Sequence, residues 1–188
     1  FFDKRNTMSI SMDVKSDKDS GNFFTFAFGK DSTCYNFLRI RGNSVRNAIT
    51  NASYQSEKEV VASGQPTGTW QNVVLVLDGT NMKLYIDGSL AAENNTGITT
   101  ASLGTDLLAY LGKSFYSGDG YFKGSFDNFK VYNRVLSEAE IVGSVIDKVP
   151  LLKKAVIGTV PENPAETIGT DSHTAVRVSI DRETKEIT

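Results

Sequence analysis

Residues 68–90, which read GTWQNVVLVLDGTNMKLYIDGSL, decide the fold class of this chain. Two runs of β-branched and other apolar residues, 73–77 and 82–86, flank Asp78-Gly79-Thr80-Asn81, a sequence typical of a hairpin turn. A second pair, Asp87-Gly88, follows directly and precedes a third short run. Glycine supplies the positive φ that such turns need, and Asp bonds to nearby backbone. The stretch therefore predicts three consecutive antiparallel strands.

The residues before this meander also show strand periodicity. In Thr7–Lys15 the apolar residues occupy every second position, which predicts a strand with one buried face. Further strands are predicted at 23–28, where Phe24, Phe26 and Phe28 share one side, and at 35–43, 45–50 and 57–61.

The character of the sequence changes after residue 137. Ser137 followed by Glu140 is a capping-box pattern and predicts a short helical turn near 137–146. Residues 148–188 contain three of the four prolines and end in a strand, turn and strand pattern. We therefore expect a first domain at 1–147, followed by a linker and a β-hairpin-like tail that begins another β module at 148–188.

Composition excludes several classes of protein. The formal net charge of -2 gives no electrostatic case for nucleic acid, and no apolar run approaches the roughly 18 residues of a membrane span. The single cysteine, Cys34, cannot form an internal disulfide, and with one histidine the chain lacks a Cys/His zinc site.

A second segment, residues 121–141 with the sequence YFKGSFDNFKVYNRVLSEAEI, adds to the opening stretch. Together the two segments resemble the laminin-G-like, concanavalin A-like lectin-glucanase domains attached to bacterial glycoside hydrolases. The resemblance implies an all-β, two-sheet antiparallel jelly-roll sandwich, with residues 121–141 as its final strand and helical turn. It also implies that Trp70 is a core anchor. The fold alone does not fix a function, because lectins, glycosidases and protein-binding domains share it.

The start of the chain departs from the family pattern. Related domains usually have a strand or two before the strand that residues 8–14 match, whereas here only residues 1–6 precede it. An uncovered sheet edge favours aggregation. We therefore expect the N-terminal segment to belong to a longer polypeptide, with residues 150–188 taking its place as the alternative.

Catalysis is not predicted. A glycosidase needs two carboxylates that face each other across a cleft, and the E-x-D-x-x-E pattern of active jelly-roll glucanases is absent from the sequence. Glu57 and Glu59 share a strand face but have no aromatic neighbours in sequence, so they indicate a solvated surface.

The family resemblance also implies a calcium site. The Asp of the final strand is often a ligand in such domains, and Asp127 is the matching residue. Ca²⁺ takes six to eight oxygen ligands. The alternative is that Asp127 bonds backbone amides and fixes the strand end.

Sugar binding requires aromatic faces together with planar polar groups. Two places offer them. The first is the strand pair with Tyr35, Asn36, Arg39, Arg41 and Asn47, and the second is the loop at 113–121 with its aromatic residues Phe115, Tyr116 and Tyr121. The competing interpretations are a solvated sheet face and packing residues.

The sequence and the resemblance together predict a non-catalytic, lectin-like module that binds a polysaccharide or glycan. Its parent would be a multidomain, extracellular or cell-surface bacterial glycoside hydrolase. The alternative is a structural module that packs against other domains of the same polypeptide without binding sugar.

Overall fold

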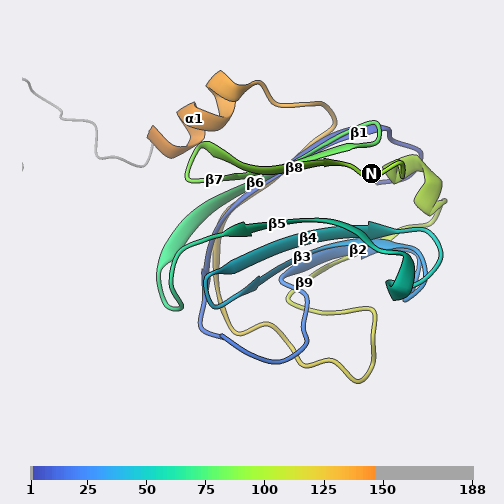
Figure 1. The fold of residues 1–188 in the computed structure, drawn as a ribbon, viewed down its shortest axis with the longest axis horizontal. Helices are drawn as coiled ribbons and strands as arrows, with labels where there is room; N and C mark the ends of the chain where they lie inside the picture. The colour runs from blue at the N-terminus through green and yellow to red at the C-terminus, as the bar shows by residue number, and fades with distance from the viewer. Residues whose placement is uncertain (1, 147–188) are drawn as a thin grey trace, which may run out of the picture. The chain divides into compact units, whose positions relative to one another are not determined.

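The computed structural model describes residues 2–146, and the predicted linker and hairpin at 148–188 lie outside the described residues. Within this part of the chain, β-strands form two five-stranded sheets whose paired strands all run antiparallel. The sheets lie face to face, as a sandwich (Figure 1). The predicted all-β jelly-roll fold is confirmed.

Sheet A has the strand order β10-β1-β6-β7-β8 and sheet B the order β5-β4-β3-β2-β9. The bounds in sheet A are β1 Thr7–Ser16, β6 Trp70–Asp78, β7 Asn81–Ile86, β8 Ser89–Asn95 and β10 Gly124–Tyr132. Those in sheet B are β2 Phe26–Gly29, β3 Tyr35–Arg41, β4 Ser44–Thr50, β5 Lys58–Ser63 and β9 Leu108–Leu111. Short 3-10 turns occupy Tyr54–Ser56 and Thr100–Leu103, and helix α1 spans Glu138–Ile146.

The core lies between the two sheets and follows the two-residue period of the strands. Met8 and Ile10 of β1 pack with Leu75 of β6 from sheet A, while Phe28 and Leu38 meet them from sheet B. All five are buried. Full burial of each such side chain contributes roughly 1.5–3 kcal/mol, so the alternation read from the sequence is the pattern that holds the sandwich together.

Strand β1 is buried on both faces, which corrects the prediction of a half-buried strand. Ser9 and Asp13, on the face away from the core, are as inaccessible as their apolar neighbours. The Ser9 hydroxyl donates to the Arg134 carbonyl at 2.9 Å and accepts the Leu136 amide at 3.0 Å. The segment that follows β10 therefore covers this face, and the periodicity of β1 alone gave no sign of it.

Helix α1 lies over the outer face of sheet A (Figure 1), where Ile141 packs against Val74 and Tyr85. Its predicted capping box is confirmed. The Glu140 carboxylate accepts the Ser137 amide at 2.9 Å, and the Ser137 hydroxyl accepts the Glu140 amide at 3.4 Å. No helix in the described residues is long and apolar enough to cross a membrane.

Trp70 is 48% exposed, which corrects its expected role as a core anchor. Val73 and Leu75 of β6 point into the core. Side chains alternate along a strand, so Trp70 belongs to the opposite face.

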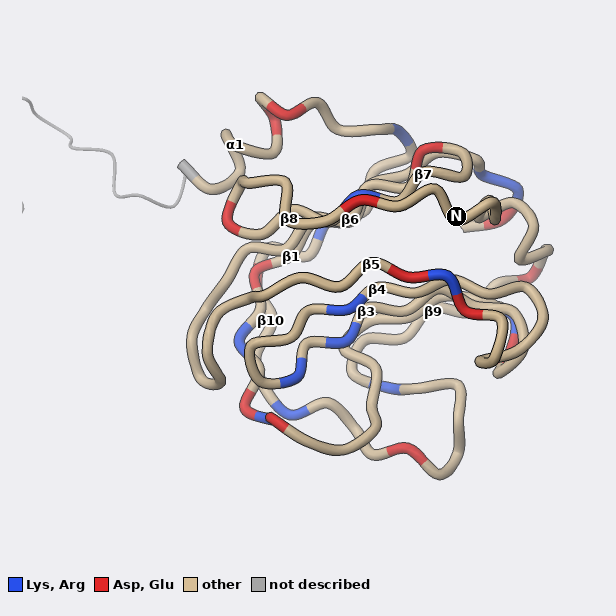
Figure 2. Tube along the Cα trace, viewed as in Figure 1, with Lys and Arg blue, Asp and Glu red and all other residues tan. Residues whose placement is uncertain are grey.

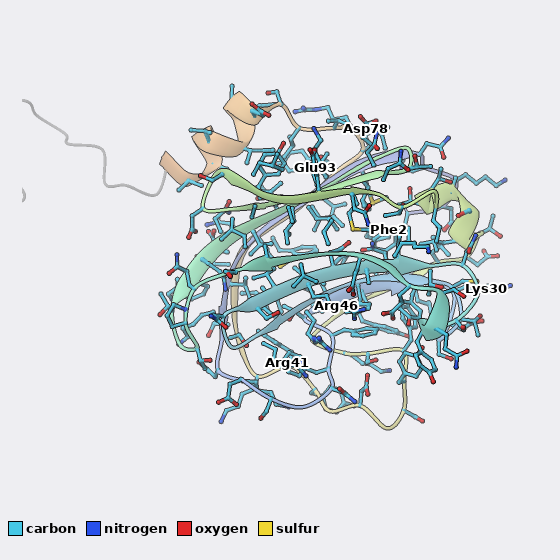
Figure 3. All side chains as sticks on the ribbon, viewed as in Figure 1. Phe2, Lys30, Arg41, Arg46, Asp78 and Glu93 are labelled. Atoms are coloured by element: carbon cyan, nitrogen blue, oxygen red, sulfur yellow. The ribbon has the colours of Figure 1, made fainter. Side chains whose placement is uncertain are left out.

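The two sides of the sandwich differ. On one side the edge strands β5 and β8 meet, and the Asn94 amide donates to the Glu59 carbonyl at 2.9 Å. On the other side, a hollow of about 310 Å³ lies against β2, β9 and β10. Phe2, labelled in Figure 3, enters this hollow and stacks on Phe28 with ring centroids 4.8 Å apart. Leu111 of β9, which also lines the hollow, is 50% exposed, so the apolar core is less well covered on this side.

Candidate carbohydrate-binding face

The face of sheet B that points away from sheet A is defined by the alternation of β3 and β4. Leu38 and Ile40 point into the core, so the residues between them in sequence point outward. We call this surface the outer face. The loops 17–25 and 112–123 pass on this side of sheet B (Figure 1).

One end of the outer face is aromatic. Phe24 precedes β2 and packs here, apart from Phe26 and Phe28 in the core, which corrects the prediction that the three share one side. Its ring stacks on Phe37 with centroids 4.0 Å apart, and Phe115 stacks on Tyr35 at 6.2 Å. The Tyr116 hydroxyl lies 3.0 Å from the Tyr35 hydroxyl and donates to the Ser32 carbonyl at 2.9 Å. The structure thus brings together three predicted site residues, of which Phe115 and Tyr116 are half-buried and Tyr35 is buried.

The middle of the outer face holds an ion-pair network. Arg46 of β4 pairs with Glu57 at 2.5 Å and, through its Nε, with Glu59. Its guanidinium also lies 5.0 Å from the centre of the Phe37 ring. The Tyr35 hydroxyl donates to the second oxygen of Glu57 at 2.5 Å. Burial, and then the bonds to Glu57 and Tyr116, raise the pKa of Tyr35 far above its ordinary value, so its hydroxyl stays protonated and donates.

The other end of the outer face is positively charged. Arg39 of β3 is half-buried and lies directly opposite Arg46. Burial, together with the charges of Arg41 and Arg46, lowers the pKa of Arg39. Arg41 donates to the Gly21 carbonyl at 3.2 Å. Figure 2 shows basic residues on β3 and β4 beside acidic residues at the start of β5 and just before it, and Figure 3 labels Arg41 and Arg46.

Tyr121 lies near the same end and is 73% exposed. The Lys18 ammonium donates to the Tyr121 carbonyl at 3.3 Å, and the Gly120 amide donates to the Asn22 carbonyl at 3.0 Å. Residues 18–22 thereby connect the loop that contains Tyr121 to Arg41. The two predicted binding regions are adjacent, as parts of one surface.

Asn36 does not belong to this surface. Its amide exchanges hydrogen bonds of 3.0 and 3.1 Å with Asn47, and both residues are fully buried. The sequence interpretation that Tyr35, Asn36 and Asn47 offer side chains to a ligand is corrected, because none of the three has accessible surface. Tyr35 instead supports Tyr116 from beneath.

The expected calcium ligand, Asp127, is exposed and accepts the amide of Asn128 at 2.7 Å. Asp13 faces it across the strand pair and accepts the side-chain amides of Asn72 at 3.0 Å and Asn128 at 2.8 Å. Among residues 2–146 no group of three or more acidic, His or Cys side chains forms a metal site. These residues do not amount to the six to eight oxygens of a calcium shell, and the calcium site stays a prediction.

Sequence reasoning missed Arg46 and the role of the two glutamates. The outward direction of Arg46 could have been predicted from the sequence. Val45 and Ile49 are apolar core positions, and Arg46 lies an odd number of residues from both, so its side chain points to the opposite face. The partner of Arg46 was not available, because the β4–β5 register that brings Glu59 opposite Ala48 is a tertiary property.

Comparison with known proteins places this fold in a family. Residues 2–142 match the model of the concanavalin A-like lectin/glucanases superfamily. An alpha-L-arabinofuranosidase of Bifidobacterium longum is 33% identical in an alignment 141 positions long, which covers 67% of this chain and 13% of that protein. The chain thus spans a small part of the curated relative that it matches.

Two solved structures share the fold. The CBM40 of a Ruminococcus gnavus sialidase, bound to α2,3 sialyllactose, has a TM-score of 0.64 at 20% identity, covering 75% of this chain and 83% of its own. Domain 4 of AbnA, a GH43 extracellular arabinanase of Geobacillus stearothermophilus in complex with arabinotriose, has a TM-score of 0.59 at 22% identity, covering 73% and 66%. These two domains share the fold of this chain, and the chain belongs to the concanavalin A-like lectin/glucanases superfamily.

Proposed function

We propose that this chain is a non-catalytic carbohydrate-binding module of a multidomain, extracellular bacterial glycoside hydrolase. The relationship to the Bifidobacterium longum arabinofuranosidase supports a glycoside hydrolase as the parent protein. The sialyllactose and arabinotriose bound by the two structural neighbours support a glycan as the ligand.

The observation on which the proposal depends is the composition of the outer face. Arg39 and Arg41 supply planar groups with several N–H donors, and Phe115, Tyr116 and Tyr121 supply aromatic rings at its border. Phe115 and Tyr116 are half-buried and Tyr121 is exposed. Sugar-binding sites combine such groups, since rings cover the apolar side of a pyranose or furanose and planar polar groups bind its hydroxyls.

The ion-pair network supports a binding role over a catalytic one. Glycosidases hold two carboxyl groups on opposite sides of the scissile bond. Glu57 and Glu59 instead converge on the same guanidinium, that of Arg46. Glu57 also accepts the Tyr35 hydroxyl.

The test is a glycan array covering arabinan, xylan, galactan, mucin and sialylated glycans. It is probed with the wild type and with two variants, Tyr121→Ala and Trp70→Ala. Tyr121→Ala should lose binding because its ring is exposed beside the outer face. Trp70→Ala is the matched control, since Trp70 is also exposed but begins β6 of sheet A. Loss of binding in Trp70→Ala alone would move the site to sheet A and overturn the proposed surface.

A second candidate function, contact with another domain of the same polypeptide, is favoured by the hollow beside β9 and β10. Its lining includes Leu111, which is 50% exposed, and the partly buried Phe129, and exposed apolar surface of this kind occurs at protein interfaces. If folded protein leaves the whole array blank and binds the parent's catalytic domain in calorimetry, this second function replaces the first.

A further inference from the structure

The charges on the outer face do not cancel along its length. In the β3–β4–β5 register, Arg39, Arg46 and Val61 share one row, and Phe37, Ala48 and Glu59 share the next. Both carboxylates of the face therefore lie toward Tyr35, and Arg46 reaches toward them. Arg39 is left at the opposite end, with Arg41 two residues further along the same face.

Arg39 combines partial burial with an absence of partners. Within residues 2–146 no hydrogen bond or ion pair reaches its guanidinium, although it is half-buried. The charged groups that act on it are Arg41 and Arg46, which oppose its charge, and then Glu57 and Glu59. Taking a charge partly out of water costs free energy unless a counter-charge compensates. Folding thus places a guanidinium where it is electrostatically incomplete.

The chemistry of the guanidinium group indicates which kind of ligand could supply the counter-charge that Arg39 lacks. Its planar fork matches a carboxylate with two parallel N–H···O bonds, and such charge-assisted bonds are about twice as strong as neutral ones. We propose that the Arg39 end of the outer face binds the carboxylate of an acidic sugar. This inference rests on the proposed function and specifies the ligand class of the same site.

The surroundings of Arg39 suit the rest of such a sugar. Val61, in the same row, is 50% exposed and offers an apolar surface. Ser44 and Ser63, opposite Arg41 and in register with each other, offer hydroxyl groups. A carboxylate held here lies on the far side of Arg46 from Glu57 and Glu59, so the guanidinium of Arg46 and its two bonds separate the like charges.

The experiment is calorimetric titration of the full chain with matched pairs of ligands. Trigalacturonate is compared with its methyl ester, and sialyllactose with the methyl ester of its sialic acid carboxyl group, so that each pair differs only in whether its carboxylates are free. The two arms separate two sources of acidic sugar. We expect an acidic member to bind at least about tenfold more tightly than its neutral partner, with the difference shrinking in 1 M salt.

Variants of Arg39 test whether this residue is responsible for the preference for acidic ligands. Arg39→Met should remove the preference for the acidic ligand, and Arg39→Lys should keep only part of it because a lysine cannot form the bidentate pair. Lys130→Gln, on exposed β10 of sheet A, is the control for loss of one positive charge. Arg39→Met should also unfold at the same or a higher temperature, since it removes an uncompensated charge, whereas loss of a purely structural arginine would lower that temperature.

Each outcome is decisive. Equal binding of acidic and neutral members overturns this inference and leaves the proposed function standing. An acidic preference that survives Arg39→Met also overturns it. If no glycan of the array or of these pairs binds to folded protein, the proposed function fails and the inference fails with it.

Discussion

Arg39 and Arg46 occupy directly opposed positions of β3 and β4. Of these two arginines, only Arg46 forms ion pairs with carboxylates in the described part of the chain. Like charges in directly opposed positions destabilise a strand pair. Glu57 and Glu59 neutralise Arg46, whereas Arg39 has no carboxylate partner within residues 2–146. The outer face thus consists of a half in which the charges are paired with one another and a half that is positively charged.

The two glutamates of the ion-pair network are expected to contribute unequally to the stability of the fold. Glu57 accepts bonds from both Arg46 and Tyr35, and its side chain is 12% exposed, whereas that of Glu59 is 44% exposed. We expect Glu57→Gln to lower the free energy of unfolding by roughly 1–3 kcal/mol, and Glu59→Gln by less than about 1 kcal/mol. Urea unfolding of the two matched variants measures this difference. Equal losses would contradict the assignment of Glu57 as the centre of the network.

The buried amide pair gives a prediction that separates stability from binding. Asn36→Leu or Asn47→Leu leaves the remaining amide without its partner, and each change should cost roughly 1–3 kcal/mol of unfolding free energy. The double variant should cost less than the sum, because it leaves no unsatisfied amide of the pair. Glycan affinity should stay within about twofold, since neither residue reaches the surface. A loss of affinity in a folded Asn36→Leu variant would restore Asn36 as part of the site.

Local patterns in the sequence were sufficient for the central meander and for the helix cap, but they did not predict the short strand β9. The Asp-Gly turns determined the β6–β7–β8 meander, and Ser137 with Glu140 determined the start of α1. Both features depend on residues only a few positions apart, so periodicity and turn chemistry reveal them.

Residues that depend on the packing of distant segments were predicted less well. Asn36 and Arg39 belong to one strand and both are polar, and only the parity set by Leu38 and Ile40 separates an interior amide from an outward guanidinium. Trp70 was assigned from a family motif, although the parity of Val73 and Leu75 places it outside. In both strands the positions of the apolar core residues already determine which face Asn36 and Trp70 occupy.

The calcium prediction at Asp127 has a direct thermal test. Ligands that bind the folded state raise the unfolding temperature. Since Asp127 and Asp13 already accept N–H groups, we expect millimolar calcium to shift that temperature by less than about 1 °C relative to EDTA. A rise that EDTA reverses and that Asp127→Asn abolishes would establish a calcium site with Asp127 as a ligand.

The capping box of α1 makes stability depend on pH. The Arg134 guanidinium, followed by the Ser137 amide and hydroxyl, lowers the pKa of Glu140 from 4.5 to about 2. A carboxyl group whose pKa is lower in the folded state binds its proton more readily when unfolded. Its contribution to stability is therefore complete above pH 4.5 and is lost as the pH falls from 4.5 toward 2.

We therefore expect Glu140→Gln to be less stable than the wild type at pH 7 and to match it near pH 2. Denaturant unfolding at a series of pH values, followed by circular dichroism, measures the gap. Glu138→Gln is the matched control, because Glu138 lies in the same first turn of α1 and shares only the interaction with the helix dipole. A gap for Glu140→Gln that stays constant between pH 7 and pH 2, or that Glu138→Gln reproduces, would show that the ion pair and the cap do not produce the effect.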